Sequence, residues 1–422
     1  MLEKILNRRN IERAIKAVER NHGAGGVDDR QSDELRPFVN ANCQSLLSRI
    51  REGNYQPSPV RKVEIPKATG GVRMLGIPTV VDRMLQQAIY QELSPIYEEE
   101  FDKHSYGFRP RKNAHQAVLT AQGYLNEGNS WIIELDLAKF FDKVNHQKLM
   151  HLLSQKVKDK STLLLINSYL KTGIMEGGVV SQRIEGTPQG SPLSPLLSNI
   201  MLQELDQELN KRGHKFVRYA DDCSIYVKSE KSAKRVMASI IKYIEFDLLL
   251  KVNREKTKIS RPQESYLLGF SFYQTKGRYE IRISPKSVNR VKAKCKAITQ
   301  SSDPKIETLK LIKLDAIIRG WVNYFKIANA KSIMEKLDEM IRTRLRISTW
   351  RRWRRIRTKV NHLLKLGIEK SKACMWGNTS KGACRVAHSP ILKRTLDMKY
   401  FRKRGYIGFY NYWQTERQPS LF

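Results

Sequence analysis

The spacing of apolar residues in the N-terminal part of the chain predicts two helices. Between residues 3 and 20 the apolar positions recur near helical intervals, which is typical of an amphipathic helix. Ser32 is a residue type that caps helices, and the acidic Asp33 and Glu34 suit a first helical turn. We therefore expect a second helix from this cap to about Glu52.

Alternation of apolar and polar residues then predicts a β-hairpin at 60–78, with its turn at 69–71. The hairpin carries the cations Lys67 and Arg73, which are either ordinary exposed strand charges or a clamp for phosphates. Further helices are expected at 79–97, 113–126, 145–170, 194–211 and 231–247, and further strands at 131–137, 177–184, 216–227, 250–258 and 266–272.

The pattern changes after residue 285. Residues 285–345 are basic and helical in spacing, without strand alternation. From Arg351 to the last residue the chain is very basic, with Trp and Tyr interleaved among the cations, a texture that suits phosphate contact combined with base stacking. A chain of 422 residues is long enough for two or three domains.

Charge narrows the class of partner. The chain has 77 Lys and Arg against 42 Asp and Glu, a net charge of +35 that is spread along its whole length. Such an excess indicates a polyanion partner, most simply nucleic acid. We expect no membrane partner and no signal peptide, because no apolar run is long enough for either. The five cysteines show no metal-binding spacing and are expected to be reduced, as in a cytoplasmic protein.

Two acidic positions are candidates for chemistry. Residues 216–227 are predicted to form two short strands joined by a tight turn that carries Asp221 and Asp222. Asp is common in turns, so this alone does not indicate function. However, the strand 131–137 also ends in an acid, Asp136. If the strands are neighbours, Asp136 and Asp221 meet, and such carboxylates suit two Mg²⁺ ions in an in-line phosphoryl transfer.

The motifs follow one another in a fixed order. They are the Lys/Arg hairpin, Tyr-Gly-Phe-Arg-Pro at 106–110, the strand ending in Asp136, Pro-Gln-Gly at 188–190, Tyr-Ala-Asp-Asp at 219–222, Asn-x-x-Lys-Thr at 253–257 and Leu-Gly-Phe at 268–270. This order resembles the reverse transcriptase family. Together with Ile-Arg-Gly-Trp-Val-Asn-Tyr-Phe at 318–325, it resembles the bacterial group II intron-encoded reverse transcriptases, also called maturases.

The resemblance implies an α+β fold of the right-hand polymerase type. Its fingers and palm would contain antiparallel sheet, followed by an α-helical thumb and a small basic C-terminal domain. The implied domains are an N-terminal extension at 1–59, fingers and palm at 60–284, a thumb or domain X at 285–350 and a DNA-binding domain at 351–422. Neither a cysteine pair nor an HNH pattern is found near the end of the chain, which resembles the endonuclease-free, class C-like members.

The resemblance also implies the catalytic residues. Asp136 and Asp221 would hold two Mg²⁺ ions, for which Mn²⁺ is an expected substitute, with Asp222 completing the acidic cluster and the carbonyl of Leu137 adding an oxygen ligand. The residues implied to bind the dNTP are Lys67, Arg73, Phe141, Gln189 and Lys256. Among these, Phe141 would be the steric gate against a ribose 2′-hydroxyl. The alternative is that Phe140 and Phe141 are both core residues.

Nucleic-acid contacts complete the implied site. The primer grip would lie at 266–272, around Leu268, Gly269 and Phe270. The cations expected to contact nucleic acid are Arg109, Arg111, Arg351, Arg352, Arg354, Arg355 and Lys381.

The implied function is RNA-directed DNA polymerisation combined with binding of the parent intron RNA. The expected partners are intron RNA, an RNA template with a DNA primer, target DNA and dNTPs, in a cytoplasmic bacterial ribonucleoprotein that supports splicing and retrohoming. Two alternatives remain at this stage. One is a splicing factor that has lost polymerisation, although all three aspartates are present. The other is a reverse transcriptase of a retron-like lineage, which the basic thumb and C-terminal region argue against.

Overall fold

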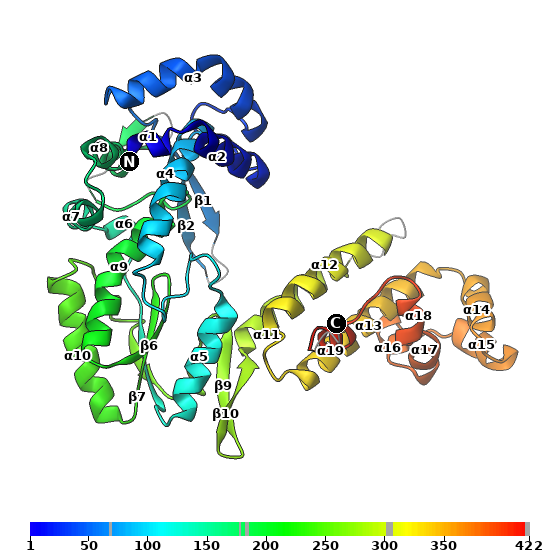
Figure 1. The fold of residues 1–422 in the computed structure, drawn as a ribbon. Helices are drawn as coiled ribbons and strands as arrows, with labels where there is room; N and C mark the ends of the chain where they lie inside the picture. Colours follow the sequence, from blue (N-terminus) through cyan, green and yellow to red (C-terminus); the bar gives the residue numbers. More distant parts are fainter. Residues whose placement is uncertain (67–69, 177–178, 182–184, 301–306, 418–422) are drawn as a thin grey trace. The chain divides into compact units, whose positions relative to one another are not determined.

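The structure is a computed structural model that describes residues 1–66, 70–176, 179–181, 185–300 and 307–417. The chain forms two compact units, Met1–Pro262 and Gln263–Phe422. Each unit has its own sheet and helices, and each is described by itself below. Figure 1 follows the chain through both units.

The centre of the first unit is an antiparallel four-stranded sheet with the strand order β6-β7-β3-β8. Its strands are β3 (Trp131–Leu135), β6 (Lys215–Tyr219), β7 (Asp222–Val227) and β8 (Lys258–Ser260). Helices α5 (Ala114–Asn126), α9 (Ser194–Lys211) and α10 (Glu230–Phe246) pack against it (Figure 1). The buried side chains of Ile133, Phe216 and Ile225 join the sheet to the hydrophobic core.

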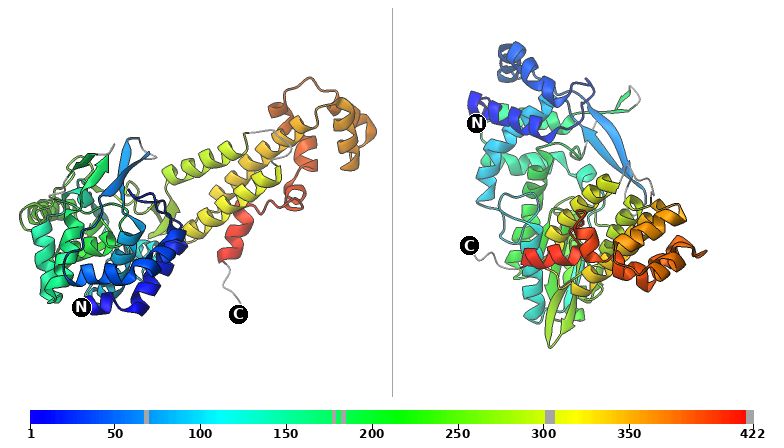
Figure 2. Two further views of the ribbon diagram at one scale, coloured as in Figure 1. Left: turned by 90° about the horizontal axis from the view of Figure 1, so that it is seen from above. Right: turned by 90° about the vertical axis from the view of Figure 1, so that its right-hand side faces the viewer.

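A second sheet of the same unit has the strand order β2-β1-β4-β5. It contains β1 (Val60–Pro66), β2 (Val72–Ile77), β4 (Ile174–Glu176) and β5 (Val179–Ser181). The β1–β2 pair is the predicted hairpin, with Arg61 opposite Ile77 and Pro66 opposite Val72, and Figure 2 shows it as an extended ribbon. Of the predicted strand 177–184, residues 179–181 form β5, whereas 177–178 and 182–184 lie outside the described residues.

The remaining helices of the first unit pack mainly against one another and against α9. They are α1 (Leu2–Ile5), α2 (Arg8–Asn21), α3 (Leu35–Arg51), α4 (Val80–Glu98), α6 (Phe140–Lys143), α7 (His146–Lys156) and α8 (Lys160–Lys171). The predicted single helix at 3–20 is in fact two helices, because the side chain of Asn7 accepts a hydrogen bond from the Arg9 amide and caps α2. The prediction that Ser32 is an N-cap is also wrong. Gln31 caps a short 3₁₀-helix, Ser32–Glu34, in a reciprocal capping box with Glu34.

The second unit begins with a hairpin of β9 (Phe270–Thr275) and β10 (Arg278–Ile283). The sequence predicted a strand at 266–272, but the observed strand starts at Phe270, and β10 was missed. Helices follow over 285–345, as expected: α11 (Pro285–Ile298), α12 (Glu307–Phe325) and α13 (Lys331–Arg352). The region beyond them, for which no elements were predicted, is also helical, with α14 (Ile356–Lys365), α15 (Lys370–Gly377), α16 (Ala383–Ala387), α17 (Pro390–Thr395), α18 (Met398–Arg402) and α19 (Phe409–Arg417).

Two features tie these helices together. The ring of Trp321 on α12 contacts those of Phe325 and Phe409. On α13 the buried carboxylate of Asp338 accepts hydrogen bonds from the Tyr406 hydroxyl and from the amides of Phe409 and Tyr410. Because α13 runs on to Arg352, the expected domain boundary at 350 and 351 falls inside one helix. The division between the two compact units lies at 262 and 263.

Candidate active site

The acidic positions meet because of strand register. β3 and β7 pair antiparallel, with Leu135 opposite Cys223. The residue after Leu135 is Asp136, and the residue before Cys223 is Asp222, so the end of β3 lies beside the β6–β7 turn. The prediction that the two acidic strands are neighbours is therefore confirmed. Asp222 opens β7 rather than standing in the turn, which Ala220 and Asp221 form.

The backbone around Asp136 is held by the segment before β8. The Asp136 amide donates to Thr257 Oγ1 at 3.2 Å, and the Asp136 carbonyl accepts from the Asn253 amide at 2.8 Å. The ammonium of Lys256 lies 3.5 Å from Asp136 Oδ2, and the Lys256 side chain is 68% exposed. The Asn-x-x-Lys-Thr motif thus places a cation next to the first aspartate while leaving that cation accessible to a ligand.

The three aspartates affect one another electrostatically. Although part of Asp222 stays exposed, desolvation by the surrounding protein raises its pKa to about 6, and the charges of Asp221 and Asp136 add to the increase. Lys256 acts in the opposite direction. An acidic group with a raised pKa is destabilised in its ionised form, and a cation bound between these carboxylates would relieve that cost.

A cavity of about 590 Å³ lies at the turn. Three of the predicted site residues line it: Phe141, Gln189 and Asp221. The other lining residues are Ala17, Val18, Asn21, Leu75, Arg83, Gln87, Phe108, Gly190, Ser191, Pro192, Ser194 and Pro195. The structure therefore brings together at a single cavity the expected steric gate Phe141, the glutamine of the Pro-Gln-Gly motif and one of the aspartates expected to bind metal.

The Pro-Gln-Gly segment is fixed from two sides. On one side the Gly76 amide of β2 donates to the Gln189 carbonyl at 2.8 Å. On the other the Thr187 amide donates to the Phe141 carbonyl at 2.5 Å. Gly190 has φ +108°, a conformation that a side chain rarely adopts. These contacts hold residues 187–190 in an irregular conformation outside any helix or strand.

The donor set fits Mg²⁺ shared with a substrate better than a metal held by protein alone. Among the described residues, no three His, Cys, Asp or Glu side chains gather into a complete metal cage. Mg²⁺ commonly takes one or two carboxylates and completes its shell with water and phosphate oxygens. Asp136 and Asp221 are of that kind. Leu137, the source of the expected carbonyl ligand, is held in place by a β-bridge to Val252.

The structure leaves part of the expected dNTP site undescribed. Lys67 lies outside the described residues, and of Arg73 only the backbone is described, in β2 opposite Ile65. The expected primer-grip residues belong to the second unit. Leu268 and Gly269 both have positive φ, +53° and +83°, and Phe270 is buried at the start of β9. The Tyr324 hydroxyl of α12 donates to the Leu268 carbonyl at 2.9 Å, which holds this bend.

One expected nucleic-acid contact needs correction. The Arg109 side chain is only 5% exposed and pairs with Glu98. Its guanidinium also donates to the carbonyls of Asp102 and Ser105. Its donors are already used inside the protein, so Arg109 is a structural residue. Of the other cations, Arg111, Arg351, Arg354, Arg355 and Lys381 are exposed, whereas Arg352 is partly buried.

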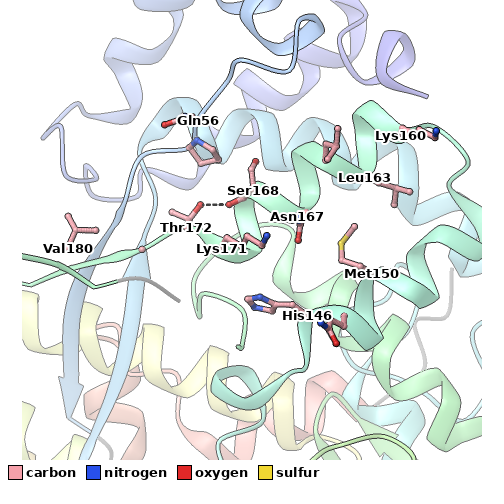
Figure 3. A pocket seen from close by; sticks show the side chains of 14 residues that line it. Gln56, His146, Met150, Lys160, Leu163, Asn167, Ser168, Lys171, Thr172 and Val180 are labelled. Atoms are coloured by element: carbon pink, nitrogen blue, oxygen red, sulfur yellow. Dashed lines mark hydrogen bonds between the residues drawn. The ribbon is translucent and has the colours of Figure 1, made fainter. Parts of the chain in front are cut away.

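The larger cavity in Figure 3, about 1190 Å³, lies elsewhere in the first unit. Its lining comes from α7, α8 and the residues around β1 and β5, and includes Met150, Leu163 and Val180. Some of its polar groups bond within the protein; for example, the Thr172 hydroxyl donates to the Ser168 carbonyl at 2.9 Å. None of the predicted site residues lines it, so we place the active site at the smaller cavity.

Sequence reasoning missed a buried ion pair beneath the turn. Arg218 on β6 and Asp206 on α9 are both fully buried and 2.5 Å apart. Burial opposes the charged guanidinium, yet Asp206 raises the pKa of Arg218 above its ordinary value. A detectable signal was present: Arg218 directly follows the apolar Phe216 and Val217 in β6, and Asp206 lies on a helix face with Leu202 and Leu209.

The antiparallel sheet with carboxylates at adjacent strand ends, beside a cavity lined by an aromatic and a glutamine, is the arrangement expected of a right-hand nucleic-acid polymerase, and the family match assigns the chain to that class. Residues 65–272 match the family of reverse transcriptases (RNA-dependent DNA polymerases), and residues 288–367 match the group II intron maturase-specific domain. The chain belongs to the family of group II intron-encoded reverse transcriptases, or maturases.

Two relatives support this assignment. Protein YkfC of Escherichia coli K12 is 33% identical over 298 residues, which are 61% of this chain and 78% of YkfC. The group II intron-encoded protein LtrA of Lactococcus lactis is 36% identical over 208 residues, or 49% of this chain but only 34% of LtrA. A solved partial Cas6-RT-Cas1–Cas2 complex matches at 26% identity over 58% of this chain and 42% of that chain, with a TM-score of 0.38.

Proposed function

We propose that this chain extends a DNA primer along an RNA template, using dNTPs, at the site formed by Asp136, Asp221 and Asp222. The observation that carries the proposal is the β3–β7 register, which brings the ends of the two acidic strands together, with Asp221 in the lining of the cavity that Phe141 and Gln189 also line. The reaction is attack of the primer 3′-hydroxyl on the α-phosphate, with pyrophosphate leaving. Two bound Mg²⁺ ions would stabilise the attacking and leaving oxygens.

The chain's own residues position the reactants. Asp136 and Asp221 would hold the metal ions through their anionic carboxylate oxygens. The exposed ammonium of Lys256 is available to a phosphate oxygen of the same nucleotide. Phe141 and Gln189 border the space for the sugar and base. Lys67 and Arg73 are proposed as further triphosphate contacts from the β1–β2 hairpin. Such positioning and charge compensation account for most catalysis of phosphoryl transfer.

We also propose that the protein binds a group II intron RNA, supports its splicing and acts with it in a ribonucleoprotein. The match of residues 288–367 to the maturase-specific domain supports this function. The net charge of +35 also supports it, because a single nucleotide-binding site requires only a few cations, whereas an excess this large suits a long polyanion such as RNA. In this proposal the N-terminal extension and the basic second unit contact RNA and target DNA.

No helix in the described part of the chain is long and apolar enough to cross a membrane.

One double substitution separates the two functions. Asp221→Ala/Asp222→Ala removes two metal-binding carboxylates and also relieves their mutual repulsion, so the fold should tolerate it. We expect cDNA synthesis to fall by about 10³-fold or more, because neutral side chains cannot hold the metal ions that the chemistry needs. Intron binding and splicing should persist. Primer extension and splicing are measured on one preparation.

The matched control is Asp33→Ala/Glu99→Ala, which removes two exposed carboxylates from the same unit. It should leave both activities unchanged. Persisting cDNA synthesis in the double variant at 221 and 222 would move the polymerase site away from this turn. Loss of splicing in the folded double variant would mean that the two functions share residues.

A further inference from the structure

The acidic turn, residues 220–222, is held in place by a buried polar network. The guanidinium of Arg218, two residues before Ala220, is fully buried. Its Nε and Nη2 donate to the two carboxylate oxygens of Asp206, at 2.7 and 2.5 Å. Its Nη1 donates to Asn199 Oδ1 and to the Ala220 carbonyl, both at 3.0 Å. One side chain therefore joins helix α9 to the turn itself.

The bond to Ala220 lies where the backbone is least favourable. Ala220 has φ +57°, in the left-handed region that costs a non-glycine residue free energy. The carbonyl that accepts from Arg218 is that of Ala220, and the next residue is the metal-binding Asp221. The direction of the Asp221 side chain thus depends on a strained peptide that Arg218 holds in place.

The Tyr-Gly-Phe-Arg-Pro motif supports the same turn. The Tyr106 amide donates to the Arg218 carbonyl at 2.8 Å, and Asn199 Nδ2 donates to the Gly107 carbonyl at 2.9 Å. Gly107 itself packs on the turn so closely that a Cβ there would lie 2.3 Å from the Ala220 nitrogen. The motif that sequence reasoning assigned to nucleic acid therefore lies against the acidic turn.

We propose that Arg218, Asp206 and Asn199 are positioning residues that fix the acidic turn in its catalytic geometry, an inference that rests on the polymerase function proposed above. None of the three is proposed to touch substrate. A guanidinium is required because its planar fork reaches Asp206, Asn199 and Ala220 at once, which a lysine ammonium cannot do. The geometry matters because a displacement of about 1 Å can cost about 100-fold in rate.

The test separates positioning from stability. Replacing only Arg218 would leave Asp206 buried without its charge partner, which destabilises any protein. Arg218→Met/Asp206→Leu removes both charges and keeps apolar volume, a change that is often neutral or stabilising for a buried pair. It still deletes the bond to Ala220. The double variant therefore isolates the effect on the turn. Asn199→Ala is a second, milder variant that cuts the link between Arg218 and Gly107.

Three quantities are measured for each variant: the thermal midpoint, the kcat and KM of primer extension, and amide hydrogen exchange in metal-free protein over residues 215–227. We expect the double variant to keep a near-wild-type midpoint. Its kcat should fall at least about tenfold with little change in the KM for dNTP, since the turn is misplaced. Exchange at the turn should be faster than in the wild type. Asn199→Ala should show the same changes to a smaller extent.

The control is Asp338→Asn, which weakens a buried carboxylate network in the other unit. It should lower the midpoint without altering exchange at the turn. A folded double variant with wild-type kcat and wild-type exchange at the turn would overturn the proposal. If the double variant fails to fold, Asn199→Ala decides instead, and unchanged exchange at the turn in that variant would overturn the proposal. The exchange readout does not need activity. If the wild type extends no primer, the polymerase proposal fails separately, while exchange still decides whether the network holds the turn.

Discussion

Phe140 and Phe141 are adjacent in the sequence but have different surroundings. Phe140 is buried in the core, 3% exposed. Phe141 lines the cavity together with Gln189 and Asp221, and its ring meets that of Phe140 edge-on at 5.3 Å. The sequence left open whether both were core residues. In the structure Phe140 is a core residue, whereas Phe141 is only partly buried against the core and also lines the cavity where we propose that the dNTP binds.

Shortening Phe141 should change sugar selectivity. Phe141→Ala is expected to raise the ratio of rNTP to dNTP incorporation by about tenfold or more, because the ring no longer clashes with a 2′-hydroxyl, and to retain some dNTP activity. Single-nucleotide primer extension measures the ratio. The control Phe140→Ala should lower stability by about 3–5 kcal/mol without changing the ratio. Equal ratios for wild type and Phe141→Ala would place the gate elsewhere.

Asp222 gives the metal-free protein a pH-dependent stability. Its pKa in the folded state is raised to about 6, so the folded protein binds the proton more tightly than the unfolded chain does. The contribution of the protonated Asp222 carboxyl to the free energy of unfolding is complete below about pH 4. It is lost as the pH rises through about 6. At neutral pH the ionised carboxylate is therefore a cost to folding, which is modest because part of the side chain is exposed.

Neutralising Asp222 should remove that cost. In the absence of divalent metal, Asp222→Asn is expected to raise the thermal midpoint at pH 7.5, whereas at pH 4 it should change little. Calorimetry at both pH values, with Asp33→Asn as the variant of an exposed acid, checks this. A midpoint gain that is the same at both pH values would show that repulsion at the turn is not its source.

At the scale of elements, α13 links the expected thumb to the basic C-terminal region. It packs against α16 and α19, and Thr349 near its end is only 2% exposed. A truncation near Thr349 would therefore remove the helices that cover α13 and confuse instability with lost binding. The exposed Arg351 in the last turn of α13 and the exposed Arg354 and Arg355 between α13 and α14 permit a gentler test.

Replacing these three arginines by glutamine should weaken target-DNA and intron binding. If each contacts a phosphate, the slope of log affinity against log salt should become less steep by up to about 3. Primer extension should persist. The matched control replaces Lys231, Lys234 and Arg235, three exposed cations on α10, by glutamine. Equal losses in the two triple variants would mean that only total charge matters.

At the scale of the whole molecule, the charge excess belongs to no single element. The net charge is +35, and cations occur throughout both compact units. Binding to a primer–template should then release many counterions. We expect affinity to fall by about 10³-fold or more between 50 and 200 mM salt, as for six or more neutralised phosphates. A slope of only about −1 would contradict the electrostatic explanation of the charge.

The spacing of apolar residues predicted the long helices and hairpins, because an element that buries one face repeats its apolar residues at the period of that element. Helices α4, α9 and α10 and the β1–β2 and β6–β7 hairpins lie close to the expected ranges. The exact ends and caps of elements were harder to predict from the sequence, because several alternative hydrogen bonds are possible there. The helix break at Asn7, the cap at Gln31 and the late start of β9 each depend on hydrogen bonds that residue type alone does not select.

The sequence by itself determined the order of the motifs, the acidic residues and the demand for a polyanionic partner, because these depend on residue identity and total charge. Only the tertiary structure decided which residues meet. Register aligned Leu135 with Cys223 and so joined acids far apart in the chain. Packing also decided that Arg109 bonds inside the protein and that Arg218 supports the acidic turn. Such roles depend on burial and on long-range hydrogen bonds, which a linear pattern does not contain.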